Sequence, residues 1–389
     1  MGNSYYRLLR EYVERVNNIY ANSKSDSSFN SLHEGMGTCM FLNYYLGCLF
    51  EDDSLLMKSR FYFESSIIKT KDGEIKNLYS FAEGLPGICW MISYYSKLIN
   101  EPVEIDRTID NLIATSAINS IKQKNVDPLY GGFGGIHYLS TQNSESKNLV
   151  LDDICKKSKL YFCIDNFGMR CRNIILKYQK ENEFDIGYAH GLSGLVSILA
   201  REIPTNATIN YLVNQMLKYI ERQYRKGFKS LYPATCLETV NISSEIIKEK
   251  YNIRLGWCYG DLSIATMYLT LYKYTGIKEY LDRSLNIAQS TLCKRSRKDS
   301  HVNDVFFCHG SSYLAYIYYK FYVYSNDHRF LDASSYWKKD VIQNFAQYMN
   351  ARDIVSYLNS LSGAIFVLLY LNESNIIRDD FFQSYLLNI

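Results

Sequence analysis

The stretch Ala189-His190-Gly191-Leu192-Ser193-Gly194 is one copy of a short unit that recurs along the whole chain. Each copy has one or two polar or reactive residues, an anchor that is nearly always glycine, a nearby small residue and an apolar run. The other copies are Glu34-Gly35-Met36-Gly37-Thr38, Glu83-Gly84-Leu85-Pro86-Gly87, Tyr130-Gly131-Gly132-Phe133-Gly134, Cys258-Tyr259-Gly260-Asp261-Leu262-Ser263, Cys308-His309-Gly310-Ser311-Ser312-Tyr313 and Asn359-Ser360-Leu361-Ser362-Gly363. The anchors lie roughly 50 to 70 residues apart, which predicts a repeat architecture whose equivalent positions surround one centre.

The apolar runs that follow the anchors predict buried helices, because they are apolar on nearly every face, as in residues 88–95 and 364–369. Amphipathic stretches with one apolar stripe lie between them, for example over residues 8–19, 209–220 and 280–292. We therefore predict an all-α fold, an α/α toroid of seven inner and seven outer helices. An open solenoid is the alternative, but the end copies have no polar capping face. The chain is expected to form a single domain over residues 1–389, with insertions near 140–185 and 225–254.

The composition argues against several classes of function. The 43 basic and 40 acidic residues give a net charge of only +3, without a basic patch for nucleic acid. The N-terminus resembles neither a signal peptide nor a myristoylation site. The longest apolar stretch, Cys39 to Phe50, is too short to span a bilayer, so no transmembrane segment and a cytoplasmic location are expected. The ten cysteines are expected to be reduced, with Cys39, Cys48 and Cys89 as small core residues.

The reactive residues are concentrated in the later copies. Cys258, Cys308 and His309 immediately precede their anchors, and the repeat register brings them together. Two thiolates and one imidazole suit a single Zn²⁺ with one open coordination position. Such a site could activate an incoming thiol, or it could activate water for hydrolysis. His190, one copy away, could exchange protons with a substrate.

Other ionisable residues of the repeats are interpreted as structural. Glu34 and Glu83 hold the same register position in the first two copies, and we interpret them as carboxylates at helix entries. The remaining histidines fall outside the reactive register and are expected to be structural or solvated; they are His33, His137, His301 and His328.

Three motifs carry a resemblance to a known family. They are residues 187–194 around His190, Trp257-Cys258-Tyr259-Gly260 and Cys308-His309-Gly310. With these motifs the chain resembles the lanthionine synthetase C-like family, specifically the LanC-type cyclases of lantibiotic biosynthesis, over essentially its whole length. The resemblance implies an α/α toroid with one central zinc. It also implies the intramolecular addition of cysteine thiols to dehydroalanine or dehydrobutyrine in a dehydrated precursor peptide, which forms thioether rings.

The family's functional residues can be carried over position by position. The resemblance implies that Cys258, Cys308 and His309 are the zinc ligands and that His190 is the active-site histidine. It also implies that Arg254 and Tyr259 lie close to the metal and that Asp127 lies near the histidine. The sequence departs from the family pattern in three places, where Ser263, Tyr313 and Ser360 stand at or near positions that are usually glycine.

The family also implies partners and alternatives. A leader-bearing precursor peptide is the implied substrate, and no dehydratase fits within 389 residues. A separate dehydratase and an export transporter are therefore the expected partners, which could hold the protein at the inner face of the membrane. Three other functions remain open at this stage: a glutathione-adding enzyme like those suggested for the family's eukaryotic branch, a non-catalytic scaffold of a modification complex, and a zinc hydrolase.

Overall fold

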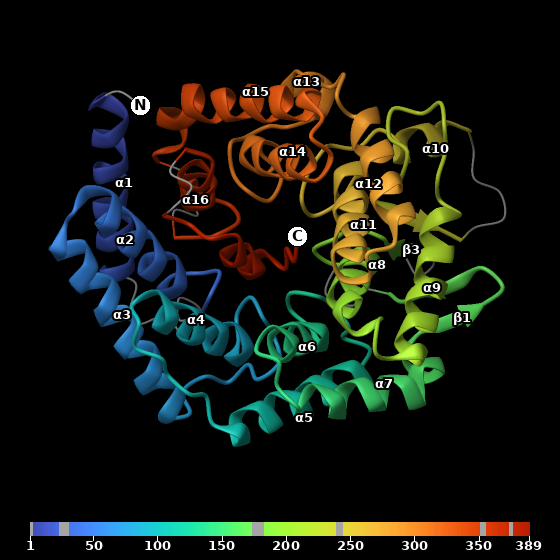
Figure 1. Ribbon diagram of the computed structural model, residues 1–389, viewed down its shortest axis with the longest axis horizontal. Helices are drawn as coiled ribbons and strands as arrows, with labels where there is room; N and C mark the ends of the chain where they lie inside the picture. Colours follow the sequence, from blue (N-terminus) through green and yellow to red (C-terminus); the bar gives the residue numbers. More distant parts are fainter. Residues whose placement is uncertain (1–2, 23–30, 173–182, 239–243, 351–354, 373–375) are drawn as a thin grey trace.

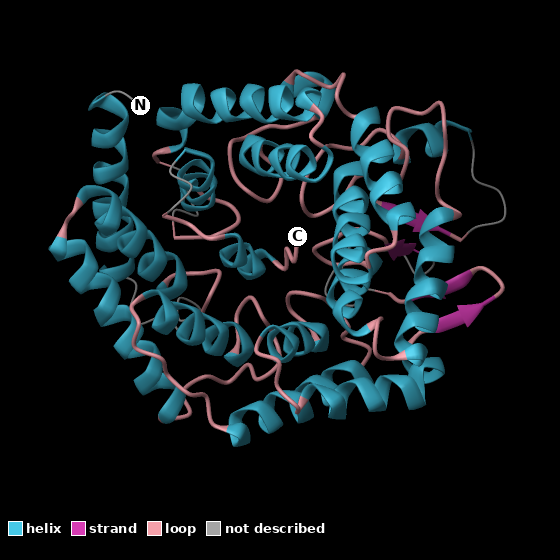
Figure 2. Cartoon of the chain, in the orientation of Figure 1, coloured by secondary structure: helices cyan, strands magenta, loops and turns pink. Residues whose placement is uncertain are grey.

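The computed structural model describes residues 3–22, 31–172, 183–238, 244–350, 355–372 and 376–389. Figure 1 shows helices arranged as an inner ring enclosed by an outer ring, with the C-terminus near the centre of the view. Helices dominate the chain, and the short strands lie together at one edge (Figure 2). The predicted α/α toroid is confirmed.

The inner helices begin directly after the anchors of the seven repeats. Each anchor is the residue immediately before the first helical residue, so the helix N-termini and their preceding loops lie at equivalent places in the ring. The inner helices are α2 (Met36–Phe50), α4 (Leu85–Leu98), α6 (Gly132–Thr141), α8 (Leu192–Leu199), α11 (Asp261–Thr275), α14 (Ser311–Ser325) and α16 (Leu361–Asn372). Most of their side chains are buried, as the uniformly apolar runs predict.

The outer helices cover the inner ring with one apolar stripe each. They are α1 (Asn3–Asn22), α3 (Asp53–Lys71), α5 (Arg107–Lys122), α7 (Lys147–Tyr161), α9 (Ala207–Glu221), α12 (Lys278–Ser290) and α15 (His328–Asn344). The pairs α2 and α3, α11 and α12, and α14 and α15 pack along their lengths. Several outer helices start at a carboxylate or amide cap, as at Asp52, Asp106, Asn206 and Asp327.

A second small residue in the repeat allows the inner helix to approach its own entry loop. A Cβ at Gly87, Gly194 or Gly363 would overlap the backbone carbonyl oxygen of the residue six positions earlier. The fifth copy has Ser263 at this position, and its anchor Gly260 has a φ of 102°, a left-handed conformation that favours glycine. Ser263 then donates a hydrogen bond to the Gly260 carbonyl at 2.8 Å. The departures from the family pattern therefore leave the toroid intact.

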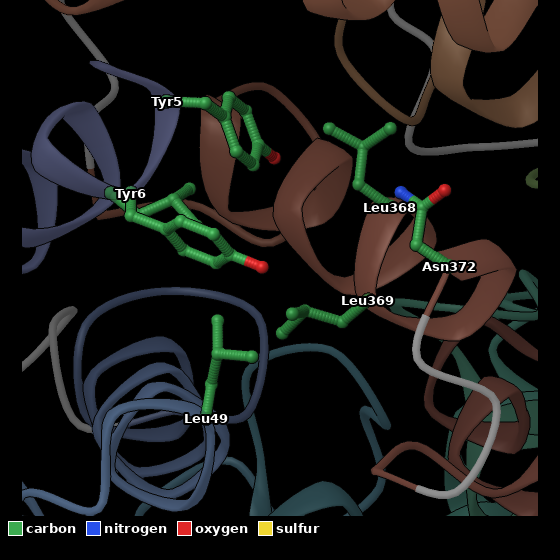
Figure 3. A pocket seen from close by; sticks show the side chains of 7 residues that line it. Tyr5, Tyr6, Leu49, Leu368, Leu369 and Asn372 are labelled. Atoms are coloured by element: carbon green, nitrogen blue, oxygen red, sulfur yellow. The ribbon is translucent and has the colours of Figure 1, made fainter. Parts of the chain in front are cut away.

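The last repeat closes the ring against the first. The backbone N–H of Tyr357 donates to the His33 carbonyl, and that of Gly35 donates to the Val355 carbonyl, both at 2.8 Å. Outer helix α1 joins this seam, where the Tyr12 hydroxyl lies 3.1 Å from the Ser360 hydroxyl. Figure 3 shows a small recess at the seam, where Tyr5 and Tyr6 of α1 face Leu368, Leu369 and Asn372 of α16, with Leu49 of α2 below. These contacts distinguish a closed toroid from an open solenoid.

The C-terminal segment fills the centre of the ring. It consists of a 3₁₀ helix, η4 (Asp379–Tyr385), and the buried residues that follow it (Figure 1). Two buried histidines hold its backbone: His33 Nε2 lies 2.6 Å from the Ser384 carbonyl, and His137 Nε2 lies 2.9 Å from the Gln383 carbonyl. Burial lowers the pKa of His33 to about 4 and that of His137 to about 3. Both imidazoles are therefore neutral structural groups at neutral pH.

Smaller elements occupy the regions where insertions were expected. Within 140–185 the structure has α7 and three strands, β1 (Cys163–Asp165), β2 (Gly168–Arg170) and β3 (Glu183–Asp185). Within 225–254 it has β4 (Thr235–Leu237) and α10 (Ser244–Lys250). The pairs β1–β2 and β3–β4 are antiparallel, so β3 and β4 join the two regions. Residues 173–182 and 239–243 of these regions lie outside the described part of the chain.

In the described part of the chain, short elements also connect the larger helices. These include η2 (Ala200–Glu202), α13 (Arg297–Ser300) and η3 (Phe345–Tyr348). Among the described residues, no helix combines the length and the hydropathy that crossing a bilayer would need.

The cysteines are unpaired, as the composition predicted. Cys39 and Cys89 are buried core residues. The prediction for Cys48 is wrong, because this residue is exposed. It lies in the last turn of α2, beyond Gly47, where the inner helix emerges from the ring. The apolar run therefore extends past the buried part of the helix.

Candidate metal centre

Two sulfur atoms and one ring nitrogen lie close together at the mouth of the inner ring. The ligand atoms of Cys258, Cys308 and His309 all lie within 4.8 Å of one another. Cys258 precedes α11, and the other two residues precede α14, so the cluster spans two neighbouring repeats. A tetrahedral zinc would place such atoms roughly 3.4 to 3.8 Å apart, given its usual bond lengths. The cluster is therefore close to an arrangement that can bind a metal.

Backbone hydrogen bonds between successive entry loops explain this convergence. The N–H of Tyr188 donates to the Cys258 carbonyl at 2.8 Å, and the N–H of Trp257 donates to the Cys308 carbonyl at 3.0 Å. The N–H of Cys308 in turn donates to the Leu358 carbonyl at 3.0 Å. Each loop is thus fixed to the next one around the ring. Residues that are about 50 positions apart in sequence become neighbours because they share a register.

The chemistry of the cluster fits a soft divalent cation. Burial disfavours a charge on Cys258, but its hydrogen bond with Cys308 and its electrostatic interactions with His309, His190 and Arg254 outweigh that effect and lower its pKa. The same hydrogen bond, together with burial, raises the pKa of Cys308. Of the two thiols, Cys258 is therefore the one that loses its proton more readily. Two sulfurs with one nitrogen are the donors that zinc prefers.

The His309 ring also lacks the partner that a buried imidazole normally has. Its Nδ1 atom is buried, and no hydrogen bond to it is found among the described residues. The nearest carboxylate oxygen, Asp304 Oδ2, is 3.9 Å away, which is too far for a hydrogen bond. Buried polar atoms rarely stay unsatisfied, so the ring fits a site in which a cation supplies the missing interaction.

His190 lies beside this cluster and is held by Asp127. The distance from His190 Nδ1 to Asp127 Oδ2 is 2.8 Å. Burial alone would lower the pKa of His190, but the charge and the hydrogen bond of Asp127 outweigh it and raise the pKa to about 9. The imidazole is therefore protonated at neutral pH. Since Nδ1 faces Asp127, Nε2 is the nitrogen through which the ring can serve a substrate.

Asp127 combines a structural role with this contact. Its Oδ1 atom accepts the backbone N–H groups of Leu129 and Tyr130, both at 2.8 Å, which shapes the third entry loop. Other copies have serine at the same place, four residues before the anchor, namely Ser31, Ser80 and Ser356. A serine has one side-chain oxygen, whereas the carboxylate has a second oxygen that reaches His190. Asp127 thus combines the loop contact that serine makes in three other copies with a contact to the site.

Arg254 and Tyr259 lie next to the predicted ligands. The Arg254 guanidinium carbon is 5.7 Å from the centre of the Tyr259 ring, a cation–π contact. Arg254 also helps to lower the pKa of Cys258. Tyr259 lies between Cys258 and the anchor Gly260, in the loop that leads into α11. The seven residues that the sequence singled out therefore gather on one side of the ring.

Sequence reasoning missed one contact in the site. The Tyr130 ring stacks on the His190 ring, with centroids 5.8 Å apart and planes 12° from parallel. Tyr130 precedes the third anchor, the position that His190 holds in the fourth copy, so the register itself was a usable signal.

Glu34 and Glu83, which precede the first two inner helices, differ in their contacts. Glu34 Oε1 accepts a hydrogen bond of 3.0 Å from the Ser356 hydroxyl, so this carboxylate helps to close the ring between the first and last repeats. Glu83 is exposed on the rim, and partial desolvation raises its pKa. Both precede the first turns of inner helices, as expected for carboxylates at helix entries.

Comparisons with known proteins agree with this geometry. The model of the family described as lanthionine synthetase C-like protein matches residues 26–387. The chain belongs to the lanthionine synthetase C-like family. The nisin biosynthesis protein NisC of Lactococcus lactis subsp. lactis is 22% identical over an alignment of 291 residues, which covers 68% of this chain and 68% of that protein.

The family fold extends over the whole molecule. A solved structure named nisin cyclase superposes with a TM-score of 0.74, covering 96% of this chain and 97% of its own. Its sequence identity to this chain is only 19%. The lanthionine synthetase C-like toroid is therefore retained although most side chains differ.

Proposed function

We propose that this protein is a zinc-dependent lanthipeptide cyclase, which joins cysteine thiols of a dehydrated precursor peptide to dehydroalanine or dehydrobutyrine. The observation that carries the proposal is the cluster of Cys258, Cys308 and His309 beside the Asp127–His190 pair, in a chain of the lanthionine synthetase C-like family. The nisin biosynthesis protein to which the chain is similar supports the same substrate class.

Three residues would hold the zinc, and they leave a fourth position for the substrate. Cys258, Cys308 and His309 would supply three ligands to the ion. When bound, zinc supplies a position at which a cysteine of the peptide loses its proton near neutral pH and becomes a nucleophile. Arg254 adds positive charge beside Cys258, which favours anionic groups in this part of the mouth.

The remaining residues would deliver the proton that the addition needs and stabilise the negative charge that it creates. The sulfur forms a bond to the β-carbon of the dehydro residue, and the electron pair of the double bond moves to an enolate. His190, protonated through its contact with Asp127, delivers a proton from Nε2 to the α-carbon. Arg254 and Tyr259 are placed to stabilise the developing negative charge. No group leaves, so the peptide keeps its mass while one thiol disappears for each ring.

The experiment measures the two quantities that this reaction fixes, the number of free thiols and the mass of the peptide. Purified protein is incubated with a dehydrated precursor that retains its cysteines, and free thiols and peptide mass are followed over time, with His190→Asn as the matched control. The proposal predicts loss of thiols faster than in the control, without a change in mass. Thiols that persist at the uncatalysed rate would contradict it. A gain of one glutathione when glutathione is supplied would instead identify a glutathione-adding enzyme.

The proposed reaction requires one protein that makes its substrate and another that removes its product. Its substrate contains dehydrated serine or threonine, so a separate dehydratase must act first on the leader-bearing precursor. The modified peptide must then leave the cell, which makes an export transporter the second proposed partner. Copurification of the protein with a tagged dehydratase, compared with the separately expressed chain, tests the first association.

A further inference from the structure

The contact between Tyr130 and His190 joins two repeats at the rim of the mouth. Tyr130 precedes α6 and His190 precedes α8, and the two rings lie nearly parallel. Asp127 belongs to the same loop as Tyr130 and binds the tyrosine's backbone N–H through Oδ1. Through Oδ2 it also holds His190 Nδ1. One loop therefore touches the imidazole both at its edge and on its face.

These two contacts restrain different motions of the ring. A hydrogen bond at Nδ1 sets a direction within the plane of the imidazole, but it leaves the plane free to tilt about that bond. An aromatic ring stacked against the face opposes the tilt, and such pairs are favourable beyond the area that they bury. The side chain of His190 is 25% exposed, so the mouth leaves room for the ring to move. Together the contacts define where Nε2 points.

From this geometry we infer that Tyr130 is a positioning residue for the reaction, which acts by holding the plane of the His190 ring so that Nε2 faces the substrate. The inference rests on the proposed function, since it assigns the residue that orients the proton donor. It needs the ring of Tyr130 and does not need its hydroxyl group. Phenylalanine should therefore replace tyrosine, whereas leucine, which is apolar but has no ring, should not.

The Tyr130 hydroxyl group is an alternative source of any effect of this residue on the reaction. It is therefore tested separately from the ring. Burial raises the pKa of Tyr130 well above its usual range, and the negative charges of Glu83, Asp127 and Glu34 raise it further. The phenol is thus neutral, and its O–H group can donate a hydrogen bond. A strong loss of rate in Tyr130→Phe would show that this donor, and not the stack, is what the reaction uses.

The test compares Tyr130→Phe and Tyr130→Leu in the holoenzyme, with zinc content and melting temperature measured for each. We expect Tyr130→Phe to keep kcat within about two-fold and Tyr130→Leu to lose roughly 2- to 10-fold in kcat, the range that the energy of an aromatic pair implies. KM should change little, because the inference has Tyr130 act on the imidazole of His190 and not on the peptide. Equal kcat values for wild type and Tyr130→Leu would overturn the inference.

A double substitution separates positioning from a general structural effect. If Tyr130 acts through His190, adding Tyr130→Leu to the His190→Asn variant should not lower the residual rate further. A further loss of the same size would overturn the inference. A readout without activity is the rate at which diethyl pyrocarbonate modifies His190, which should rise in Tyr130→Leu and stay unchanged in Tyr130→Phe. If wild type forms no rings at all, the proposed function fails, while the modification rates still decide the role of Tyr130.

Discussion

Acid should destabilise this fold through the two histidines that hold its C-terminal segment. His33 and His137 are buried in the centre of the ring and contact the carbonyls of Ser384 and Gln383. Burial lowers the pKa values of these imidazoles from 6.5 to about 4 and about 3, respectively. In the unfolded chain both rings take up a proton near pH 6.5. The stability that comes from keeping them neutral is therefore complete above pH 6.5 and is lost as the pH falls toward 4 and 3.

The loss of stability follows from the difference between the pKa values of each histidine in the folded and unfolded states. Each pH unit below 6.5 costs about 1.4 kcal/mol for each histidine until its folded pKa is reached. At pH 5 the cost is about 2 kcal/mol for each ring, or about 4 kcal/mol for both. Domains are typically stable by only about 5–15 kcal/mol, so this change should be plainly measurable.

Urea unfolding, followed by tryptophan fluorescence between pH 7 and pH 5, provides the assay. His137→Gln keeps a donor for the Gln383 carbonyl but does not titrate in this range, so its stability should fall less steeply by about 1.4 kcal/mol per pH unit. His328→Gln, at an exposed position, is the matched control and should follow wild type. Parallel pH dependences of wild type and His137→Gln would refute the reasoning. Comparison of variants cancels the titration of buried carboxyl groups such as Asp185, whose pKa burial raises to about 6.

Three further predictions concern the mouth of the ring. His190→Asn should bind zinc normally by metal analysis while thioether formation fails or gives misplaced rings; normal products would remove His190 from the reaction. Asp127→Ser should preserve the entry loop, as serine does in other copies, but lower kcat by at least ten-fold; a rate equal to wild type would show that His190 needs no anchor. Gly194→Ala should cost about 1–3 kcal/mol in urea unfolding, because the new Cβ overlaps the Tyr188 carbonyl, whereas Gly256→Ala, with ordinary contacts, should cost less.

Much of the toroid could be predicted from the sequence because its repeats are regular. Every anchor proved to be the residue before an inner helix, and the fully apolar runs proved to be buried on all sides. The convergence of Cys258, Cys308 and His309 followed from the same register, although many residues separate the two cysteines. A periodic sequence thus determines which distant residues meet, since neighbouring copies are joined in the same way.

Features that break the repeat could not be predicted. The C-terminal segment after α16 has no copy elsewhere, and its contacts with His33 and His137 span hundreds of residues. The strands β1 to β4 have three residues each, too few for an alternating pattern to be recognised. The register places Tyr130 and His190 directly before their anchors, but the stack of their rings also depends on side-chain directions across two loops.

Contacts of the loop that holds Cys308 connect the C-terminal segment to the candidate metal centre. Cys308 is bonded to the neighbouring loops through both its N–H and its carbonyl. Phe307, the residue before it, stacks on Tyr385 of the C-terminal segment, with ring centroids 3.9 Å apart. The candidate metal centre therefore rests on the element that the two buried histidines hold. Acid unfolding of that element should release zinc in the same pH range in which stability is lost.

X-ray absorption at the zinc edge tests the central claim most directly. The account predicts that zinc in the purified protein has two sulfur neighbours and one imidazole, at about 2.3 Å and 2.0–2.1 Å, and that one sulfur is lost or zinc released in Cys308→Ala. Addition of the dehydrated peptide should bring one more sulfur to the metal. A first shell of oxygen and nitrogen alone, or a Cys308→Ala variant with unchanged zinc content and spectrum, would contradict the account.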